Sequence, residues 1–264
     1  MFISRLKYML GDLLAGLMSF RIWWGLALLD IKLRYRRTVI GPIWVTMSFM
    51  ISAIVLSVVF STLFHMQSKE LLAYIVVGLA VWTFMVNTLS DSCNTFIRGA
   101  GLILEKKIPL STHAYRLVAR NVLLFGHNMV AVIIVLCFLR VAPTPWMLFA
   151  IPSLLLIIIN GFWLAILLGL IVCRFRDMQE LIIVALNVAF FVTPVFWKRE
   201  MLGTRVWIAD INPLYHFLVL LRSSILGYPI PLGSWCVPLS VTVALGLLTL
   251  IFASRHIRKV GFWL

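Results

Sequence analysis

The chain has 264 residues, of which 62% are hydrophobic and only 12% charged, and its mean hydropathy is +1.06. This balance excludes an ordinary soluble domain and indicates a protein that lies almost entirely in a membrane. We therefore interpret the net charge of +14 as a sign of orientation and of attraction to anionic lipid, and we expect no binding of nucleic acid.

The N-terminal segment, 1–40, is expected to remain at the inner membrane surface. Asp12 interrupts its apolar part and no A-x-A site follows, so we do not expect a cleaved signal peptide. Residues 22–37 are predicted to form an amphipathic helix that lies along the membrane surface. Its charged side carries three residues spaced by helical turns: Asp30, Arg34 and Arg37.

Six uncharged stretches follow, and each is predicted to cross the membrane as a helix. At about 1.5 Å per residue, about 20 residues cross the hydrocarbon core, and the first stretch has 24 residues. Continuous apolarity without alternation excludes a β-barrel. The expected fold is an all-α membrane protein, a single domain over 1–264 with a six-span bundle in 41–254. The predicted transmembrane helices are 41–64, 71–90, 121–139, 141–173, 181–197 and 231–254.

Proline-containing segments interrupt the region between the fifth and sixth spans. Thr193-Pro-Val-Phe-Trp197 breaks the fifth span near its outer end, and Asn212-Pro-Leu-Tyr-His-Phe217 begins a further helical piece. The stretch 213–226 is too short to span and contains Arg222, so it is predicted to be a re-entrant or interfacial helix.

The positive charges predict the orientation. Of the 23 Lys and Arg residues, 17 fall on one side, in segment 1–40, in the second-to-third and fourth-to-fifth connections, and in the tail 255–264. Because basic residues favour the cytoplasmic side, both termini are predicted to be cytoplasmic in a multi-pass protein of the inner membrane.

The residues within the spans exclude several mechanisms. They include no Asp, Glu or Lys, which coupling to protons or sodium usually requires. The chain has no G-x-x-x-x-G-K-[ST] motif to hold ATP phosphates and no Cys or His spacing typical of a metal site. Cys137 and Cys236 fall near the outer ends of their spans, so a disulfide between them stays open, although we expect free thiols. If ATP drives this protein, a partner must bind it.

Four segments together point to a family. They are R-Y-R-R-T-V-I-G-P-I-W at 34–44, Glu105-Lys-Lys-Ile-Pro-Leu110, Phe175-Arg-Asp177 and Asn212-Pro-Leu-Tyr215. In their order and spacing the chain resembles the permease subunit of type 2 ABC transporters, in the polysaccharide-export branch that moves O-antigen, capsule or teichoic-acid chains. The resemblance implies a homodimer, a polyprenyl-linked glycan as cargo and two cytoplasmic subunits that bind ATP and Mg, with no cofactor in this chain.

The resemblance also implies that cytoplasmic connections couple the permease to its ATPase. Polar residues cluster on these short connections, where a partner would dock. The residues assigned to coupling are Glu105, Lys106, Lys107, Arg174, Arg176 and Asp177.

Aromatic residues in the spans and at their outer ends suit the wall of a channel for a sugar polymer. Sugar rings have apolar C–H faces that stack on aromatic side chains, and an uncharged wall gives a sliding polymer few strong binding sites. The same residues also suit helix packing and membrane-interface belts, so each is only a candidate. The candidates are Trp44, Phe60, Phe64, Trp82, Phe84, Phe190, Phe191, Phe196, Trp197 and Tyr215.

Arg34, Arg36 and Arg37 stand just before the first span. Their guanidinium groups are candidates to bind the pyrophosphate of a polyprenyl-linked glycan at a gate, through bidentate hydrogen bonds. The alternative is anchoring to anionic lipid, which needs positive charge alone.

Two other functions stay open. A drug or small-lipid exporter of the same superfamily would share the fold. An integral-membrane lipid-modifying enzyme would need a polar catalytic cluster, and His113, His216 and His256 have no spacing typical of metal or acid-base chemistry. We therefore expect a transporter permease and not an enzyme.

Overall fold

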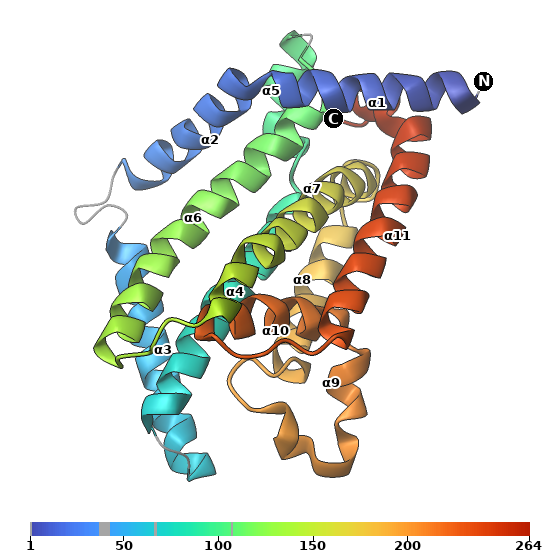
Figure 1. Cartoon of the computed structure of the whole chain (residues 1–264). Helices are drawn as coiled ribbons and strands as arrows, with labels where there is room; N and C mark the ends of the chain where they lie inside the picture. Colours follow the sequence, from blue (N-terminus) through green and yellow to red (C-terminus); the bar gives the residue numbers. More distant parts are fainter. Residues whose placement is uncertain (1, 37–42, 66–67, 107) are drawn as a thin grey trace.

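The computed structural model describes residues 2–36, 43–65, 68–106 and 108–264, and every regular element in these residues is a helix. The long helices form a bundle, and α1 lies across one end of it (Figure 1). Both chain ends and α5 lie at that end, which we call the terminal end, whereas α9 lies at the opposite, distal end (Figure 1). The predicted all-α fold is confirmed.

The helices differ widely in length. The longer ones are α1 (Phe2–Met18), α2 (Phe20–Tyr35), α3 (Ile43–Phe64), α4 (Ser68–Ser92), α6 (Ser111–Phe138), α7 (Ala150–Arg174), α8 (Met178–Val192), α10 (Pro213–Leu226) and α11 (Gly233–His256). The shorter ones are η1 (Ile97–Gly99), α5 (Ala100–Glu105), η2 (Pro145–Phe149), η3 (Arg199–Arg205), α9 (Trp207–Ile211), η4 (Ile257–Lys259) and α12 (Val260–Trp263).

Five helices of the described chain are long and apolar enough to cross a membrane, namely α3, α4, α6, α7 and α11. They correspond to five of the six predicted spans. The predicted span 181–197 corresponds to α8, which has 15 residues and would cover roughly 22 Å, less than the hydrocarbon core. α8 ends at Val192 because Thr193 has extended backbone, the conformation that a residue before proline favours.

A sixth span by length and composition exists only if α1 and α2 are counted together, as one span broken by a bend of 66°. α2 corresponds to the predicted helix 22–37 and packs along α6. Its Asp30 points to α6, whereas Leu28, Leu29 and Leu33 are exposed. The carboxylate on the charged side of this helix is therefore turned toward the bundle.

Asp12 of α1 fixes the start of α6. Its two carboxylate oxygens accept hydrogen bonds from the backbone N–H groups of Leu110 and Ser111, both at 2.9 Å. The first N–H groups of a helix have no partner within the helix and favour a negative charge. The residue that interrupts the apolar N-terminal segment is thus a cap supplied by another helix.

α10 matches the predicted short helix 213–226 and is inserted into the bundle. The Asn212 side chain accepts from the N–H of Leu214 at 3.0 Å, and Pro213 occupies the first helical position. Gly227 ends the helix in the left-handed region, with φ of 74°. Because α10 packs against α4, α7 and α11 and its central residues are buried, it is held within the bundle and not on its outer surface.

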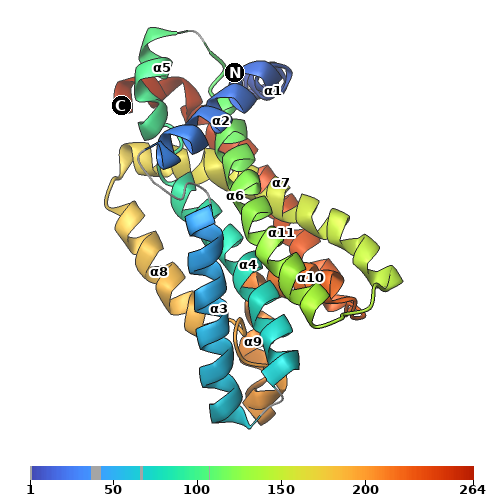
Figure 2. The same cartoon turned by 90° about the vertical axis from the view of Figure 1, so that its left-hand side faces the viewer.

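α4 lies at the centre of the packing and contacts α3, α6, α7 and α10. Gly161 of α7 permits a close approach, since a Cβ atom there would lie 2.7 Å from Thr88 Cγ2 of α4. In contrast, α3 and α8 lie at the periphery (Figure 2) and expose large apolar side chains such as Ile51, Val58, Val184 and Phe191. These exposed faces suit lipid or a second subunit.

Candidate functional site

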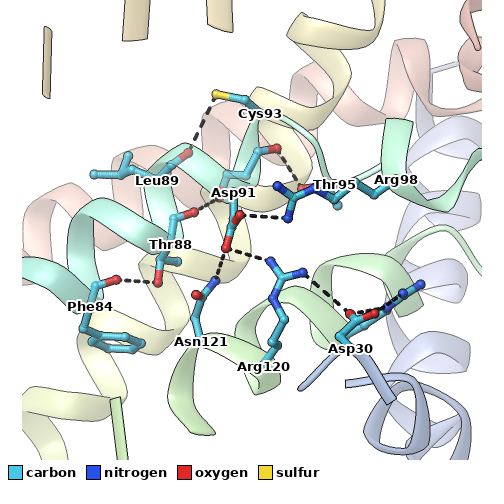
Figure 3. Close-up of polar contacts among 12 residues, drawn as sticks. Asp30, Phe84, Thr88, Leu89, Asp91, Cys93, Thr95, Arg98, Arg120 and Asn121 are labelled. Carbon is cyan, nitrogen blue, oxygen red and sulfur yellow. Dashed lines mark hydrogen bonds and ion pairs between the residues drawn. The ribbon is translucent and has the colours of Figure 1, made fainter. Parts of the chain in front are cut away.

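Two aspartates and three arginines form a connected ion-pair network near the terminal end (Figure 3). Arg120 is central, because its Nη2 donates to Asp91 Oδ2 at 2.7 Å and its Nη1 lies 3.6 Å from Asp30 Oδ2. Arg116 donates through Nε and Nη2 to the two oxygens of Asp30. Arg98 donates to Asp91 Oδ1 at 2.9 Å. The network joins α2, α4, η1 and α6.

Four helical elements place the members of the network, and Arg98 lies on η1. Arg116 and Arg120 are four residues apart on α6 and so project from one face. Asp91 lies in the last turn of α4, and Asp30 lies near the end of α2. The side chains of Arg116 and Arg120 are only 18% and 13% exposed, so the carboxylates compensate cations that are largely withdrawn from water.

Two cavities, of about 260 and 400 Å³, open on this network. Arg116 lines the first and Arg34 lines the second. The residues that line both are Asp30, Asp91, Arg98 and Arg120. Four arginines therefore face two carboxylates, and this excess of positive charge favours an anion. We call the two cavities together the arginine cavity.

Two buried polar atoms at the walls of the arginine cavity have no hydrogen-bond partner among the described residues. They are His113 Nε2 and Asn121 Oδ1. The other amide atom of Asn121, Nδ2, donates to Asp91 Oδ2 at 3.2 Å. A phosphate oxygen is an acceptor for guanidinium N–H groups and for a proton on His113 Nε2.

Of the three arginines predicted to bind pyrophosphate, the structure brings Arg34 to the arginine cavity. Arg36 is exposed at the end of α2 and lines neither cavity, and Arg37 lies outside the described residues. The sequence analysis did not assign Arg116 or Arg120 to this site. Their spacing of four residues near the start of a long helix is the signal from which they could have been found.

The residues assigned to coupling lie at the terminal end, except that Lys107 is outside the described residues. Glu105 and Lys106 line a wide groove of about 810 Å³, together with residues of α1 and with Arg258. Arg174 ends α7, and its guanidinium carbon lies 5.5 Å from the centre of the Trp263 ring of α12. Arg176 and Asp177 are exposed in the turn before α8. Because α12 contacts both α5 and α7, it connects the two predicted coupling segments.

Six of the ten predicted channel aromatics form a continuous series of ring contacts, which we call the aromatic cluster. Phe60 stacks on Phe196, with ring centres 4.4 Å apart. Phe190 contacts Phe196 at 5.3 Å and Trp82 at 5.7 Å. The members of the cluster are Phe60, Phe64, Trp82, Phe190, Phe191 and Phe196. α3, α4 and the end of α8 are thereby joined.

The other four aromatic candidates lie elsewhere. Phe84 is buried and stacks on Phe125 of α6 at 4.8 Å, so it belongs to the core. Trp44 is exposed at the start of α3. Tyr215 lines a cavity together with Tyr74 and Arg222, and the Trp197 carbonyl accepts a hydrogen bond from Tyr74 Oη at 3.1 Å.

The cysteines are free thiols. Cys137 and Cys236 are exposed and Cys93 and Cys173 are buried, in agreement with the expectation of free thiols.

The chain can be compared with known proteins. The ABC-2 type transporter family matches residues 23–226 of the chain, from α2 to the end of α10. The chain belongs to the ABC-2 type transporter family. It is therefore a transporter permease and not an enzyme, and membership implies a membrane location and an ATP-binding partner subunit.

Two curated relatives of this ABC-2 permease are both named O-antigen export system permease protein RfbA, from Klebsiella pneumoniae. The first is 24% identical over 209 residues, which cover 75% of this chain and 79% of the relative. The second is 23% identical over 191 residues, which cover 70% of this chain and 72% of the relative. This similarity agrees with the branch that the sequence motifs resemble.

Proposed function

We propose that this ABC-2 permease exports a polyprenyl-linked polysaccharide of the O-antigen, capsule or teichoic-acid type across the inner membrane. Two copies of the permease form the channel, and two cytoplasmic subunits bind and hydrolyse ATP with Mg. The arginine cavity is the observation that carries the proposal. An excess of cationic donors near the terminal end suits the pyrophosphate that joins such a glycan to its lipid.

The distribution of positive charge supports the direction of transport. With the basic connections and both termini on the cytoplasmic side, the arginine cavity faces the compartment in which a lipid-linked glycan is made. Arg34, Arg98 and Arg120 would then bind the pyrophosphate at its cytoplasmic access point. Arg36 lines neither part of the arginine cavity and Arg37 lies outside the described residues, so the gate role of these two arginines stays a prediction.

The aromatic cluster supports a glycan as the cargo. Five of its rings, those of Phe60, Phe64, Phe190, Phe191 and Phe196, are at least partly exposed, whereas Trp82 is buried. Sugar rings can stack on this uncharged surface without being held tightly. The exposed apolar faces of α3 and α8 suit the association of two permeases around such a surface.

The groove beside Glu105 and Lys106 supports docking of the ATP-binding subunit. It is bounded by α1, α5 and the C-terminal residues, and Arg174 and Trp263 tie the second coupling segment to the same region. Movement of a partner seated in the groove would therefore reach α7 through α12. Glu105, Lys106, Lys107, Arg174, Arg176 and Asp177 remain the proposed coupling residues.

Deletion of the gene in its own cell tests this function. Lipid-linked polysaccharide should accumulate inside the cell and disappear from its surface, and a wild-type copy should restore export. A normal surface polysaccharide, together with altered resistance to apolar compounds, would contradict the proposal in favour of the drug or small-lipid alternative.

A further inference from the structure

A separate cavity of about 390 Å³ lies toward the distal end, between the start of α4, the 198–200 segment and α10. Its volume is in the range of small-ligand sites. Three tyrosines, Tyr74, Tyr215 and Tyr228, supply aromatic surface. Charged groups of both signs, among them Lys198, Glu200 and Arg222, line it as well. We call it the distal cavity.

Arg222 is the most deeply buried charged residue of this wall, with only 4% of its surface exposed. Its Nη1 donates to the Pro194 carbonyl at 2.8 Å, and its guanidinium carbon lies 3.8 Å from the centre of the Tyr74 ring. Among the described residues, no carboxylate forms an ion pair with it. A carbonyl and an aromatic face offset only part of the cost of burying a cation, so further oxygen acceptors in the cavity are favourable.

The combination of groups selects a class of ligand. Aromatic rings accept the C–H faces of a sugar, while its hydroxyl groups donate to a carboxylate such as Glu200 and accept from Lys198 or Arg222. Because Arg199 is paired with Asp210, the charges of Lys198 and Arg222 are balanced by those of Glu70 and Glu200, and the wall has no excess of positive charge to favour a small inorganic anion. A purely apolar molecule would leave the charged groups without partners. We propose that the distal cavity is a saccharide site for sugar units that emerge from the channel. This inference rests on the proposed function for its cargo.

The distal cavity and the aromatic cluster share one backbone segment. Tyr74 Oη donates to the Trp197 carbonyl at 3.1 Å, and Arg222 bonds to the carbonyl of Pro194. Phe196 lies between Pro194 and Trp197 in the sequence and supplies a ring of the aromatic cluster. Gly78 allows α4 to approach this segment, because a Cβ atom there would lie 2.8 Å from the Val195 carbonyl oxygen. A sugar held in the distal cavity therefore contacts residues that position the wall of the proposed channel.

Binding of a lipid-free oligosaccharide tests the site. The probe is the polysaccharide of the cell that carries this chain, released from its lipid pyrophosphate with mild acid and cut to short oligomers. Binding to the permease–ATPase complex in nanodiscs is measured by saturation-transfer NMR. Tyr228→Ala should weaken binding about tenfold, as expected for loss of an aromatic anchor. Trp207→Ala should leave it unchanged, because Trp207 is equally exposed, 57% against 56% for Tyr228, and does not line the cavity.

A second variant tests the site even if Tyr228→Ala fails to fold. Glu200→Gln preserves shape at an exposed position and removes the carboxylate acceptor, so it should also weaken binding, with an unchanged elution volume of the complex. Failure of the wild-type complex to bind the probe, or equal binding by Tyr228→Ala, Glu200→Gln and Trp207→Ala, would overturn the saccharide site. Failure of the proposed function is distinguishable, since it would appear as normal glycan export after gene deletion.

Discussion

At the scale of single residues, the position of a charge in the fold decides what it can do. Arg34 and Arg36 are two residues apart on the same basic segment, yet Arg34 lines the arginine cavity and Arg36 lines neither part of it. Arg116 and Arg120 are paired with aspartates and hold the wall of that cavity together. Phosphate recognition and membrane anchoring are therefore separable by substitution.

Arg34→Lys should weaken recognition of the lipid-linked glycan. Lysine keeps the charge but loses the planar pair of donors, and loss of one charge-assisted hydrogen bond of about 1.5–3 kcal/mol lowers affinity about tenfold or more. The measurement is the concentration of lipid-linked glycan that half-maximally stimulates ATPase activity of the reconstituted complex. Arg36→Lys is the matched control and should behave as wild type. Equal behaviour of both variants, with normal membrane insertion, would mean that Arg34 serves only as an anchor.

The carboxyl group of Asp210 should have a pKa below the ordinary value for aspartate. Its hydrogen bonds from Arg199 hold its pKa below 3.8. A carboxyl with a lowered pKa contributes stability above about pH 4 that is lost as the pH falls through the lowered pKa, and this exposed pair contributes little in total. Carbon NMR of Asp-labelled protein in micelles should show the Asp210 midpoint rise toward 3.8 in Arg199→Gln. An unchanged midpoint would indicate that the pair does not persist in solution.

At the scale of elements, close helix packing depends on small residues at few positions. Gly161 brings α7 against Thr88 of α4, and α4 is the helix that contacts most of the bundle and carries Asp91 in its last turn. Separation of α4 from α7 would therefore affect both the core and the wall of the arginine cavity.

Gly161→Ala should destabilise the protein by about 1–3 kcal/mol, because its Cβ would lie 2.7 Å from Thr88 Cγ2 and overpacking of a tight core has this magnitude. Gly126→Ala on α6 is the control, since nothing lies within 4 Å of a Cβ there. Thermal unfolding in detergent should show a lower midpoint for Gly161→Ala only. A double variant with Thr88→Ser, which removes the contacting methyl group, should recover part of the loss, and no recovery would assign the effect to another contact.

At the scale of the whole molecule, the bundle has two chemically different ends. The terminal end holds α5 and both termini, whereas α9 lies at the distal end (Figure 1). The arginine cavity and the groove beside α5 belong to the terminal end, and the distal cavity lies toward the other. Export toward the distal end requires the terminal end to be cytoplasmic.

Cysteine labelling measures this orientation. In a variant without the exposed Cys137 and Cys236, Thr204→Cys should react with an impermeant maleimide added to intact cells, and Lys106→Cys should react only after lysis. Both positions are exposed, so their difference reports the side of the membrane. The reverse pattern would place the arginine cavity outside and contradict the proposed direction.

Local physics made much of this fold predictable from the sequence. Long uncharged runs predicted the spans that correspond to α3, α4, α6, α7 and α11. The reason is that a single segment in lipid can form all of its backbone hydrogen bonds internally only as a helix. Pro213, Arg222 and the short length predicted α10 with its observed bounds. The order of short motifs predicted the family, which the match over residues 23–226 confirmed.

Only the tertiary structure decided which side chains meet. Asp30, Asp91 and Arg120 come from three helices, and their contact depends on how far each helix is rotated about its axis, which a hydropathy pattern does not fix. The same reason explains why Phe60 and Phe196 meet in the aromatic cluster while Phe84 enters the core. α8 ends where the backbone of Thr193 becomes extended. The segment that follows is held by hydrogen bonds from Arg222 to the Pro194 carbonyl and from Tyr74 to the Trp197 carbonyl. The sequence thus determined what crosses the membrane, and packing between distant helices determined where charge and aromatic surface gather.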